Sequence, residues 1–494
     1  MKQIRVSTAA LVVLIMAVFF TTNAVAQVQD NDWSEPYRLS SDIGSVIGAG
    51  GRIVADDYGN VHVFWVEGGF DDLRTVIMYA RFDGVTWSEP VDIWLSVPDS
   101  TFGFLSNPIV DQSGNLHIAW TMGQSGPILY YNAPIDGALS ARNWVRHQSI
   151  EVPANRAELE VDSQGTLHIV YSNLEGNEPG VYYIRSKDGG ESWSHPFWID
   201  PDKPLIYTPA RVILLRDEVT DALHVLYKYD EMIDEVGVGK DIRYVHSFDG
   251  GNTWSNPFMV DTADEGIDEL RAGGMVFAVY DNQVHVVWAG TSTTRREHRY
   301  SLDGGITWTE TFRVFGELNG SAGDSLVFDG DGHLQFLGQI RFPQGMWNVT
   351  WNGEEWGEPS LVYLIRQTSE DEHQGIHIHA INAIVQSGNR LIATFTNSPS
   401  EDQQFLYVMI RDLDDVVQEP ILPMPTATPQ VEPTPIPTRD KFVEPTPFPH
   451  QPFDANANFD PVSPAGGLWA SLIPSVALVG LVMMVGLMIR QRTR

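Results

Sequence analysis

The chain has 494 residues, with 64 acidic and 31 basic side chains, a net charge of -33 at neutral pH, and no cysteine. This charge argues against nucleic acid as a partner, because phosphate binding needs a basic surface that releases counterions. Solubility alone would account for such a charge. Without cysteine the fold has no disulfides, so its stability must come from packing.

The first element predicted along the chain is a secretory signal peptide over residues 1–26. Lys2 and Arg5 precede the apolar run ALVVLIMAVFF, and the small residues AVA end at Ala26, where cleavage is expected. The mature protein is therefore expected to be exported.

A turn motif then recurs as SKDGGESWS at 186–194, SFDGGNTWS at 247–255 and SLDGGITWT at 301–309, with looser copies at 81–90 and 350–359. A single copy has the composition of a glycine-rich ligand loop, but flanking alternating apolar residues predict a β-hairpin. Asp accepts backbone hydrogen bonds in turns, and paired Gly residues allow positive φ. Because a repeated turn cannot be one catalytic centre, we interpret its members as structural: Asp188, Asp249, Asp303, Trp193, Trp254 and Trp308.

A second pattern of D-x-x-G hairpins, such as VADDYGNVHVFW, alternates with the first. It places one histidine at the same point of five copies: His62, His117, His168, His224 and His285. Aligned histidines can indicate a metal site or a proton relay. Blades around a ring would hold them far apart, so we interpret them as packed, hydrogen-bonded residues.

Seven tryptophans mark the outer hairpins at intervals of 48 to 61 residues: Trp33, Trp87, Trp144, Trp193, Trp254, Trp308 and Trp356. Four strands in about 50 residues, repeated seven times, predict an all-β, seven-bladed β-propeller over residues 33–415. The series opens with a lone strand, WSEPYRLS at 33–40, and closes with an incomplete hairpin at 382–395. The N-terminal strand is therefore predicted to complete the last blade and close the ring.

The S-x-D-G-G-x-x-W copies resemble the Asp-box, or BNR repeat, of the sialidase (neuraminidase) superfamily. The resemblance covers residues 33 to about 415 and implies a propeller that carries this turn on the outer hairpin, away from any active site. It is specific for the fold rather than for an activity, because Asp-boxes also occur in glycanases and in propellers without catalysis. Sialidases proper have six blades, whereas this chain has seven predicted blades.

The D-x-x-G and D-G-G turns belong to one rim of such a propeller, and the long, varied connections belong to the other. A pocket is expected on the long-connection side, over the central channel. Four arginines stand just before innermost strands there: Arg52, Arg156, Arg211 and Arg271. Guanidinium groups pair well with carboxylates, which predicts ligand binding, although solvated arginines offsetting an acidic rim are an alternative.

The resemblance implies further roles, because sialidases bind the sugar-acid carboxylate with three arginines from different blades. Arg52-Ile53-Val54 partly matches their Arg-Ile-Pro motif, with Val in place of Pro. A sialidase also needs a Tyr nucleophile with a Glu partner and an Asp acid/base, and topology makes Tyr207, Glu158 and Asp42 the candidates. The segment EDEHQGIHIH at 370–379 has ligand types that zinc prefers but no known spacing. We expect no metal and no cofactor.

Beyond the propeller, residues 419–464 are rich in proline and predict a disordered, extended stalk, with PxxP-mediated ligand capture as the alternative. Residues 468–489 carry no charge and are long enough to cross a bilayer. The basic tail at 490–494 predicts a cytoplasmic C-terminus and an extracellular propeller. We therefore expect a single-pass membrane protein that binds an extracellular glycan or surface protein, with an exo-sialidase-type glycoside hydrolase and a non-catalytic assembly scaffold as alternatives.

Overall fold

The computed structural model describes residues 32–414, except 43, 69–73, 98–100, 177, 205, 234–235, 263–273, 290–295, 316–322, 342–343, 367–377 and 401–402. The predicted signal peptide, stalk, membrane helix and basic tail lie outside the described residues. Within the described part of the chain, no helix is long and apolar enough to span a bilayer.

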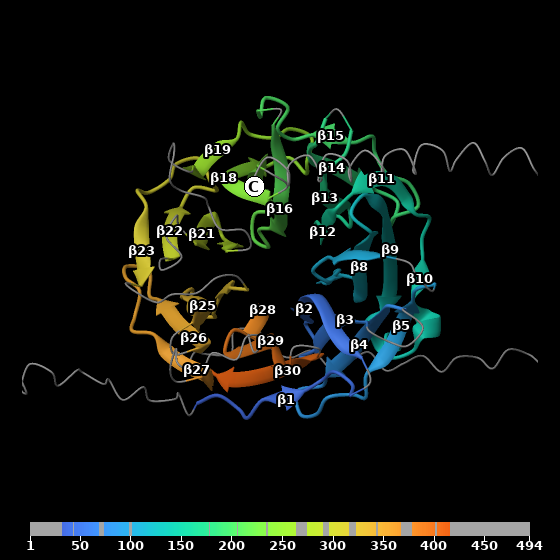
Figure 1. Ribbon diagram of the computed structural model, residues 1–494, viewed down its shortest axis with the longest axis vertical. Coiled ribbons are helices and arrows are strands. Elements are labelled where there is room, and N and C mark those ends of the chain that lie inside the picture. The colour runs from blue at the N-terminus through green and yellow to red at the C-terminus, as the bar shows by residue number, and fades with distance from the viewer. Residues whose placement is uncertain are drawn as a thin grey trace, which may run out of the picture. The chain divides into compact units, whose positions relative to one another are not determined.

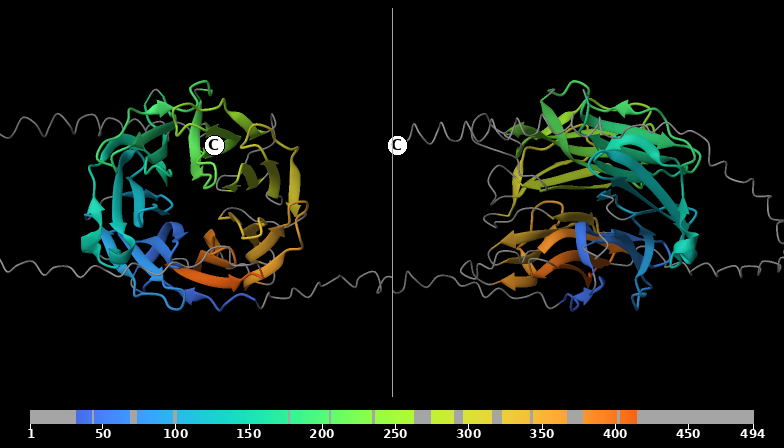
Figure 2. Two further views of the ribbon diagram at one scale, coloured as in Figure 1. Left: turned by 180° about the vertical axis from the view of Figure 1, so that it is seen from behind. Right: turned by 45° about the vertical axis from the view of Figure 1, so that its right-hand side comes forward.

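Seven antiparallel sheets surround a common centre and form a seven-bladed β-propeller, as predicted (Figure 1). Figure 2 shows the same ring from behind and from an oblique angle. Five blades consist of four consecutive strands, ordered from the centre outward. These are blade 1, β2 (Ser45–Ala55), β3 (Val61–Gly68), β4 (Val76–Phe82) and β5 (Val91–Leu95); blade 3, β12 (Arg156–Val161), β13 (Leu167–Asn173), β14 (Gly180–Ser186) and β15 (Phe197–Trp198); blade 4, β16 (Tyr207–Arg216), β17 (Leu223–Ile233), β18 (Val236–Ser247) and β19 (Phe258–Thr262); blade 5, β20 (Met275–Tyr280), β21 (Gln283–Ala289), β22 (Arg296–Ser301) and β23 (Phe312–Phe315); and blade 6, β24 (Ser325–Phe328), β25 (Leu334–Arg341), β26 (Gln344–Trp351) and β27 (Ser360–Arg366).

Blade 2 departs from this plan, because its inner and outer strands are each divided. Its strands are β6 (Phe102–Leu105), β7 (Ile109–Val110), β8 (Asn115–Met122), β9 (Gly126–Pro134), β10 (Val145–Arg146) and β11 (Ile150–Ala154). Pro108 has no N–H to donate, and the N–H of Asn107 donates to Glu158 in blade 3 rather than to the ladder. Two 3-10 turns, η1 (Ile135–Gly137) and η2 (Ala141–Asn143), connect β9 to β10 in the outer hairpin of this blade, in place of a tight turn.

Blade 7 joins the two ends of the propeller. It consists of β28 (Ile378–Gln386), β29 (Arg390–Ser400), β30 (Gln403–Asp412) and, at its outer edge, β1 (Tyr37–Arg38). Tyr37 lies opposite Val408, and the N–H of Ser34 donates to the carbonyl of Ile410 at 2.7 Å. The predicted closure of the last blade by the N-terminal strand is therefore confirmed (Figure 1).

The D-G-G turns are held by their own polar side chains. Asp249 accepts hydrogen bonds from the N–H and hydroxyl of Thr253 at 2.8 and 2.7 Å, while Ser247 Oγ donates to Asp249 Oδ1 at 2.9 Å. Gly250 and Gly251 have φ of 64° and 75°. Asp188 and Asp303 accept the same set of bonds in their own turns.

The aligned histidines form hydrogen bonds within individual blades. His62 Nδ1 lies 2.8 Å from Tyr79 Oη, and its Nε2 lies 3.1 Å from Asp56 Oδ2 in the D-x-x-G turn. The same chain of side chains recurs in blades 2 and 3 as Asp111–His117–Tyr130 and Asp162–His168–Tyr183. Each chain lies within one blade and links the inner turn to the third strand. No group of His, Asp or Glu side chains arranged to hold a metal occurs among the described residues.

Candidate functional site

A cavity of about 1070 Å³ is lined by the innermost strands of all seven blades. One end of the cavity carries the D-x-x-G turns, represented by Asp56 and Asp111. The other end is where each innermost strand begins, after the connection from the preceding blade. The pocket therefore lies in the central channel. That it opens on the long-connection side stays a prediction, because several of those connections lie outside the described residues.

Strand register divides the cavity wall into rings to which each blade contributes one residue. One of these layers, which we call the aliphatic ring, contains the residues that lie opposite the aligned histidine positions on the neighbouring strand. All of its members are aliphatic except Glu160. Its members are Val54, Ile109, Glu160, Leu215, Ala278, Val327 and Ile384. This ring offers almost no hydrogen-bonding groups to a ligand.

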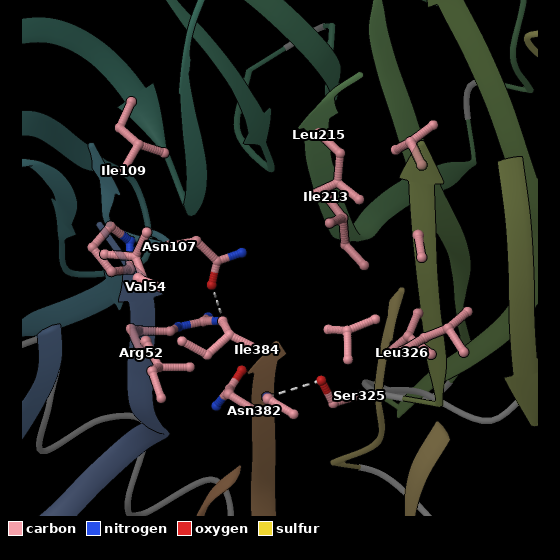
Figure 3. Close-up of a pocket in the computed structure, with 18 of the residues that line it drawn as sticks. Arg52, Val54, Asn107, Ile109, Ile213, Leu215, Ser325, Leu326, Asn382 and Ile384 are labelled. Carbon is pink, nitrogen blue, oxygen red and sulfur yellow. Dashed lines mark hydrogen bonds between the residues drawn. The ribbon is translucent and has the colours of Figure 1, made fainter. Parts of the chain in front are cut away.

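Two residues earlier in each strand lies the polar ring, in which five of the seven members are polar. It consists of Arg52, Asn107, Glu158, Ile213, Val276, Ser325 and Asn382. Figure 3 shows Arg52 and Asn107 facing each other across the cavity wall, with Ser325 and Asn382 on neighbouring strands. Arg52 Nη1 donates to Asn107 Oδ1 at 3.0 Å.

Arg156 and Arg211 also line the cavity, each two residues before the polar-ring residue of its own strand. The guanidinium carbons of Arg52 and Arg156 each lie 4.7 Å from the centre of the Phe104 ring. Burial, together with the positive charges of Arg156 and Arg52, lowers the pKa of Arg211 to about 10. The structure therefore brings three of the four predicted arginines, from blades 1, 3 and 4, to one part of the cavity.

Glu158 is the carboxylate among these arginines. Its side chain is buried, and its Oε2 accepts the N–H of Asn107 at 3.1 Å. Burial raises the pKa of Glu158, while Arg52, the Asn107 N–H, Arg211 and Arg156 oppose the rise by favouring the charged form. A second carboxylate, Asp324, lines the cavity but is bound by Arg296 through two hydrogen bonds of 2.6 and 3.2 Å.

Glu160 lies two residues beyond Glu158, within the aliphatic ring. Burial, opposed by Arg216 and reinforced by the charges of Glu218 and Glu158, raises the pKa of Glu160 to about 8. A neutral Glu160 near pH 7 would keep the aliphatic ring uncharged.

The other predicted site residues lie elsewhere. Tyr207 packs against Tyr229, with ring centres 6.4 Å apart, and does not line the described part of the cavity. Asp42 pairs with Arg38 at 2.6 Å, and its side chain is 77% exposed. Arg271 lies outside the described residues, as do His373 and His377 of the segment 370–379, for which no metal was expected.

Sequence reasoning missed Phe104, Asn107, Ser325 and Asn382. Aligning the D-x-x-G hairpins would have found the last three, because each stands two residues before the aliphatic-ring position of its blade. No repeat signal marks Phe104, because it lies in β6, the first part of an inner strand that is divided in blade 2 but continuous in the other blades.

The sequence matches no family model and no curated protein. Solved structures share the fold at low identity. An ulvan lyase of polysaccharide lyase family PL25, bound to -[GlcA(1-4)Rha3S]-, is 12% identical with a TM-score of 0.55, over 75% of this chain and 95% of that one. The polysaccharide lyase Uly1 is 11% identical with a TM-score of 0.50, over 80% and 96%. The NanB sialidase of Streptococcus pneumoniae is 14% identical with a TM-score of 0.44, over 80% and 72%. These identities show a shared fold and no more.

Proposed function

We propose that the propeller binds an acidic saccharide in its central cavity, with the sugar carboxylate on Arg52, Arg156 and Arg211. The observation that carries this proposal is the convergence of three guanidinium groups from three blades beside one carboxylate, Glu158. Guanidinium groups bind carboxylates through paired, charge-assisted hydrogen bonds.

The three arginines make this part of the cavity positive, although the whole chain is strongly negative. The protein carries a net charge of -33, yet Arg52, Arg156 and Arg211 gather around Glu158 in one part of the cavity, while Asp324, which also acts on Arg211, is hydrogen-bonded to Arg296. Local positive potential in a cleft attracts and orients anions. The buried Arg52 Nε has no hydrogen-bond partner among the described residues, so its N–H is available to a carboxylate oxygen of a ligand.

The remaining wall suits a sugar ring. Asn107, Ser325 and Asn382 supply amide and hydroxyl groups for sugar hydroxyls, and the aliphatic ring supplies an apolar floor beneath them. A small number of convergent polar groups over apolar surface is typical of ligand sites. The similar ulvan lyase is bound to a fragment that contains glucuronic acid, which makes glucuronate the first probe.

The signal peptide, stalk and membrane helix predicted from the sequence support an extracellular position for this binding activity. In this proposal the protein is a single-pass surface receptor for an extracellular glycan. It takes no nucleic acid and needs no cofactor.

Calorimetric titration of the purified full-length chain with glucuronate tests the proposal, with glucose as the neutral control. We expect Arg156→Ala and Arg211→Ala each to weaken glucuronate binding at least tenfold, because each removes a charged hydrogen-bond partner. Arg216→Ala is the matched control, since Arg216 lines the opposite end of the same cavity and pairs with Asp221. Equal binding by all three variants, or no binding of any acidic saccharide, would refute the proposal.

Hydrolysis is the second candidate, and the arginine trio is what favours it. Against it, Tyr207 and Asp42 do not meet Glu158 in the described structure. Release of the fluorophore from a fluorogenic sialoside by the purified protein between pH 4 and 8 would establish hydrolysis. A membrane partner that co-purifies with a protein that binds no saccharide would instead favour the non-catalytic assembly scaffold.

A further inference from the structure

We propose that the segment Phe104–Asn107 of blade 2 positions the arginine site, with Phe104 spacing Arg52 and Arg156 and Asn107 coupling Arg52 to Glu158. The inference rests on the proposed carboxylate-binding function and names the residues that give that site its geometry. Blade 2 lies between the blades that carry Arg52 and Arg156, and its segment contributes no charge of its own.

Phe104 contacts both guanidinium groups. The guanidinium carbons of Arg52 and Arg156 lie at the same distance from its ring centre, 4.7 Å. Cations are attracted to an aromatic face, whereas two guanidinium groups left alone in a cavity repel each other. Phe104 therefore gives each arginine an attractive partner and fixes where the two positive charges stand.

The backbone of β6 fixes Phe104 in turn. Its N–H donates to Thr121 Oγ1 at 3.0 Å. A Cβ at Gly103 would lie 2.3 Å from that oxygen and 2.4 Å from the carbonyl of Gly123, so only glycine lets β6 approach β8 this closely. Phe102 packs against the hydrophobic cluster between blades 1 and 2, whereas Phe104 lines the cavity.

Asn107 connects the charged residues of two blades. Its side-chain oxygen accepts from Arg52 Nη1 at 3.0 Å, and its backbone N–H donates to Glu158 Oε2 at 3.1 Å. The N–H is available to Glu158 because the inner strand of blade 2 is interrupted before Pro108. The break in this strand thus orients Arg52 and Glu158 relative to each other.

Phe104→Leu removes the aromatic face and keeps an apolar side chain. We expect it to weaken glucuronate binding about tenfold, which corresponds to the energy of two modest cation–π contacts. Phe104→Tyr keeps the ring and should retain binding within about twofold. Phe102→Leu is the matched control, because it alters core packing on the same strand and should leave glucuronate binding unchanged.

A second readout needs no ligand. Labelling with phenylglyoxal, mapped by mass spectrometry, should proceed several times faster at Arg52 and Arg156 in Phe104→Leu than in the wild type or Phe104→Tyr. Asn107→Ala removes the side-chain acceptor of Arg52 but keeps the backbone N–H, so it should accelerate the labelling of Arg52 alone. It provides the test if Phe104→Leu does not fold.

The two readouts separate the two proposals. The wild-type protein could bind no acidic saccharide while Phe104→Leu still speeds the labelling of both arginines. That result would refute the binding function and support the positioning role. Unchanged labelling in Phe104→Leu and Asn107→Ala, or unchanged glucuronate binding in Phe104→Leu, would overturn the positioning role.

Discussion

The second glycine of each D-G-G turn packs on a tyrosine of the preceding blade. A Cβ at Gly190, Gly251 or Gly305 would lie 2.3, 2.0 or 2.2 Å from the nearest atom of Tyr130, Tyr183 or Tyr244. Those tyrosines are the ones that hold the aligned histidines. In the looser turn copies of blades 1 and 6, Val85 and Glu354 occupy this position, and the preceding blades carry Val408 and His298 at the tyrosine position. Each of these glycines therefore has a tyrosine opposite it, whereas the two looser turns have neither residue.

Gly251→Ala and Gly250→Ala separate this contact from backbone strain. Both glycines have positive φ, but a Cβ at Gly250 meets nothing within 4 Å. We expect Gly250→Ala to lower the free energy of unfolding by about 1 to 2 kcal/mol and Gly251→Ala by more than about 3 kcal/mol, measured by chemical unfolding. An equal loss of unfolding free energy in the two variants would show that the contact between Gly251 and Tyr183 does not contribute to stability.

At the scale of the strand pair, blade 5 joins β21 to β22 through two histidines instead of a histidine and a tyrosine. Trp356 Nε1 donates to His298 Nδ1 at 3.1 Å, and His298 Nε2 lies 3.0 Å from His285 Nδ1. Because an indole N–H can only donate, the proton order is fixed, and His298 Nε2–H must donate to His285. Burial lowers the pKa of His285 to about 3 and that of His298 well below its ordinary value.

This pair should make the protein sensitive to acid. Both histidines are neutral when folded and bind protons when unfolded, so the stability present above about pH 6.5 is lost as the pH falls toward about 3. His298→Tyr restores the pairing of the other blades and removes one of the two groups. We expect it to reduce the slope of unfolding free energy against pH between 6 and 4 by about 1.4 kcal/mol per unit. An unchanged slope in His298→Tyr would contradict the assignment.

At the scale of the whole molecule, the two-residue strand β1 closes the ring against β30, together with a bridge from Trp33 to Arg411. Because the chain has no cysteine, this closure can be locked covalently without side reactions. Tyr37→Cys with Val408→Cys places two thiols at directly opposed positions.

The disulfide would close a loop that spans nearly the whole propeller, which should stabilise it by up to about 5 kcal/mol relative to the reduced form. Thermal unfolding with and without reductant measures this difference, and the Tyr37→Cys single variant controls for the substitution. Failure of the two thiols to oxidise in folded protein would show that the N-terminal strand does not complete blade 7.

The blade count, the closing strand and the arginines could be predicted from the sequence, because they follow from a repeat whose turns are encoded locally. The repeat assigns Arg52, Arg156 and Arg211 to innermost strands, which is why they were found together. The prediction that they stand just before those strands was wrong, because Arg156 begins β12 while Arg52 and Arg211 lie inside β2 and β16. Phe104, and the contact of Gly251 with Tyr183, could not be predicted, because they depend on packing between blades. Tyr207 was assigned by topology alone, and its side chain belongs to the wall between blades 3 and 4 rather than to the cavity.

The central claim is that the cavity arginines hold a carboxylate. The most direct test is a crystal structure of the full-length protein soaked with glucuronate, solved at a resolution that places the carboxylate. We expect the carboxylate oxygens within hydrogen-bond distance of Arg52, Arg156 and Arg211, with the sugar next to the aliphatic ring of the cavity wall and its hydroxyls on Asn107 and Asn382. Glucuronate bound on the outer surface, or in the cavity with its carboxylate turned away from all three arginines, would contradict it.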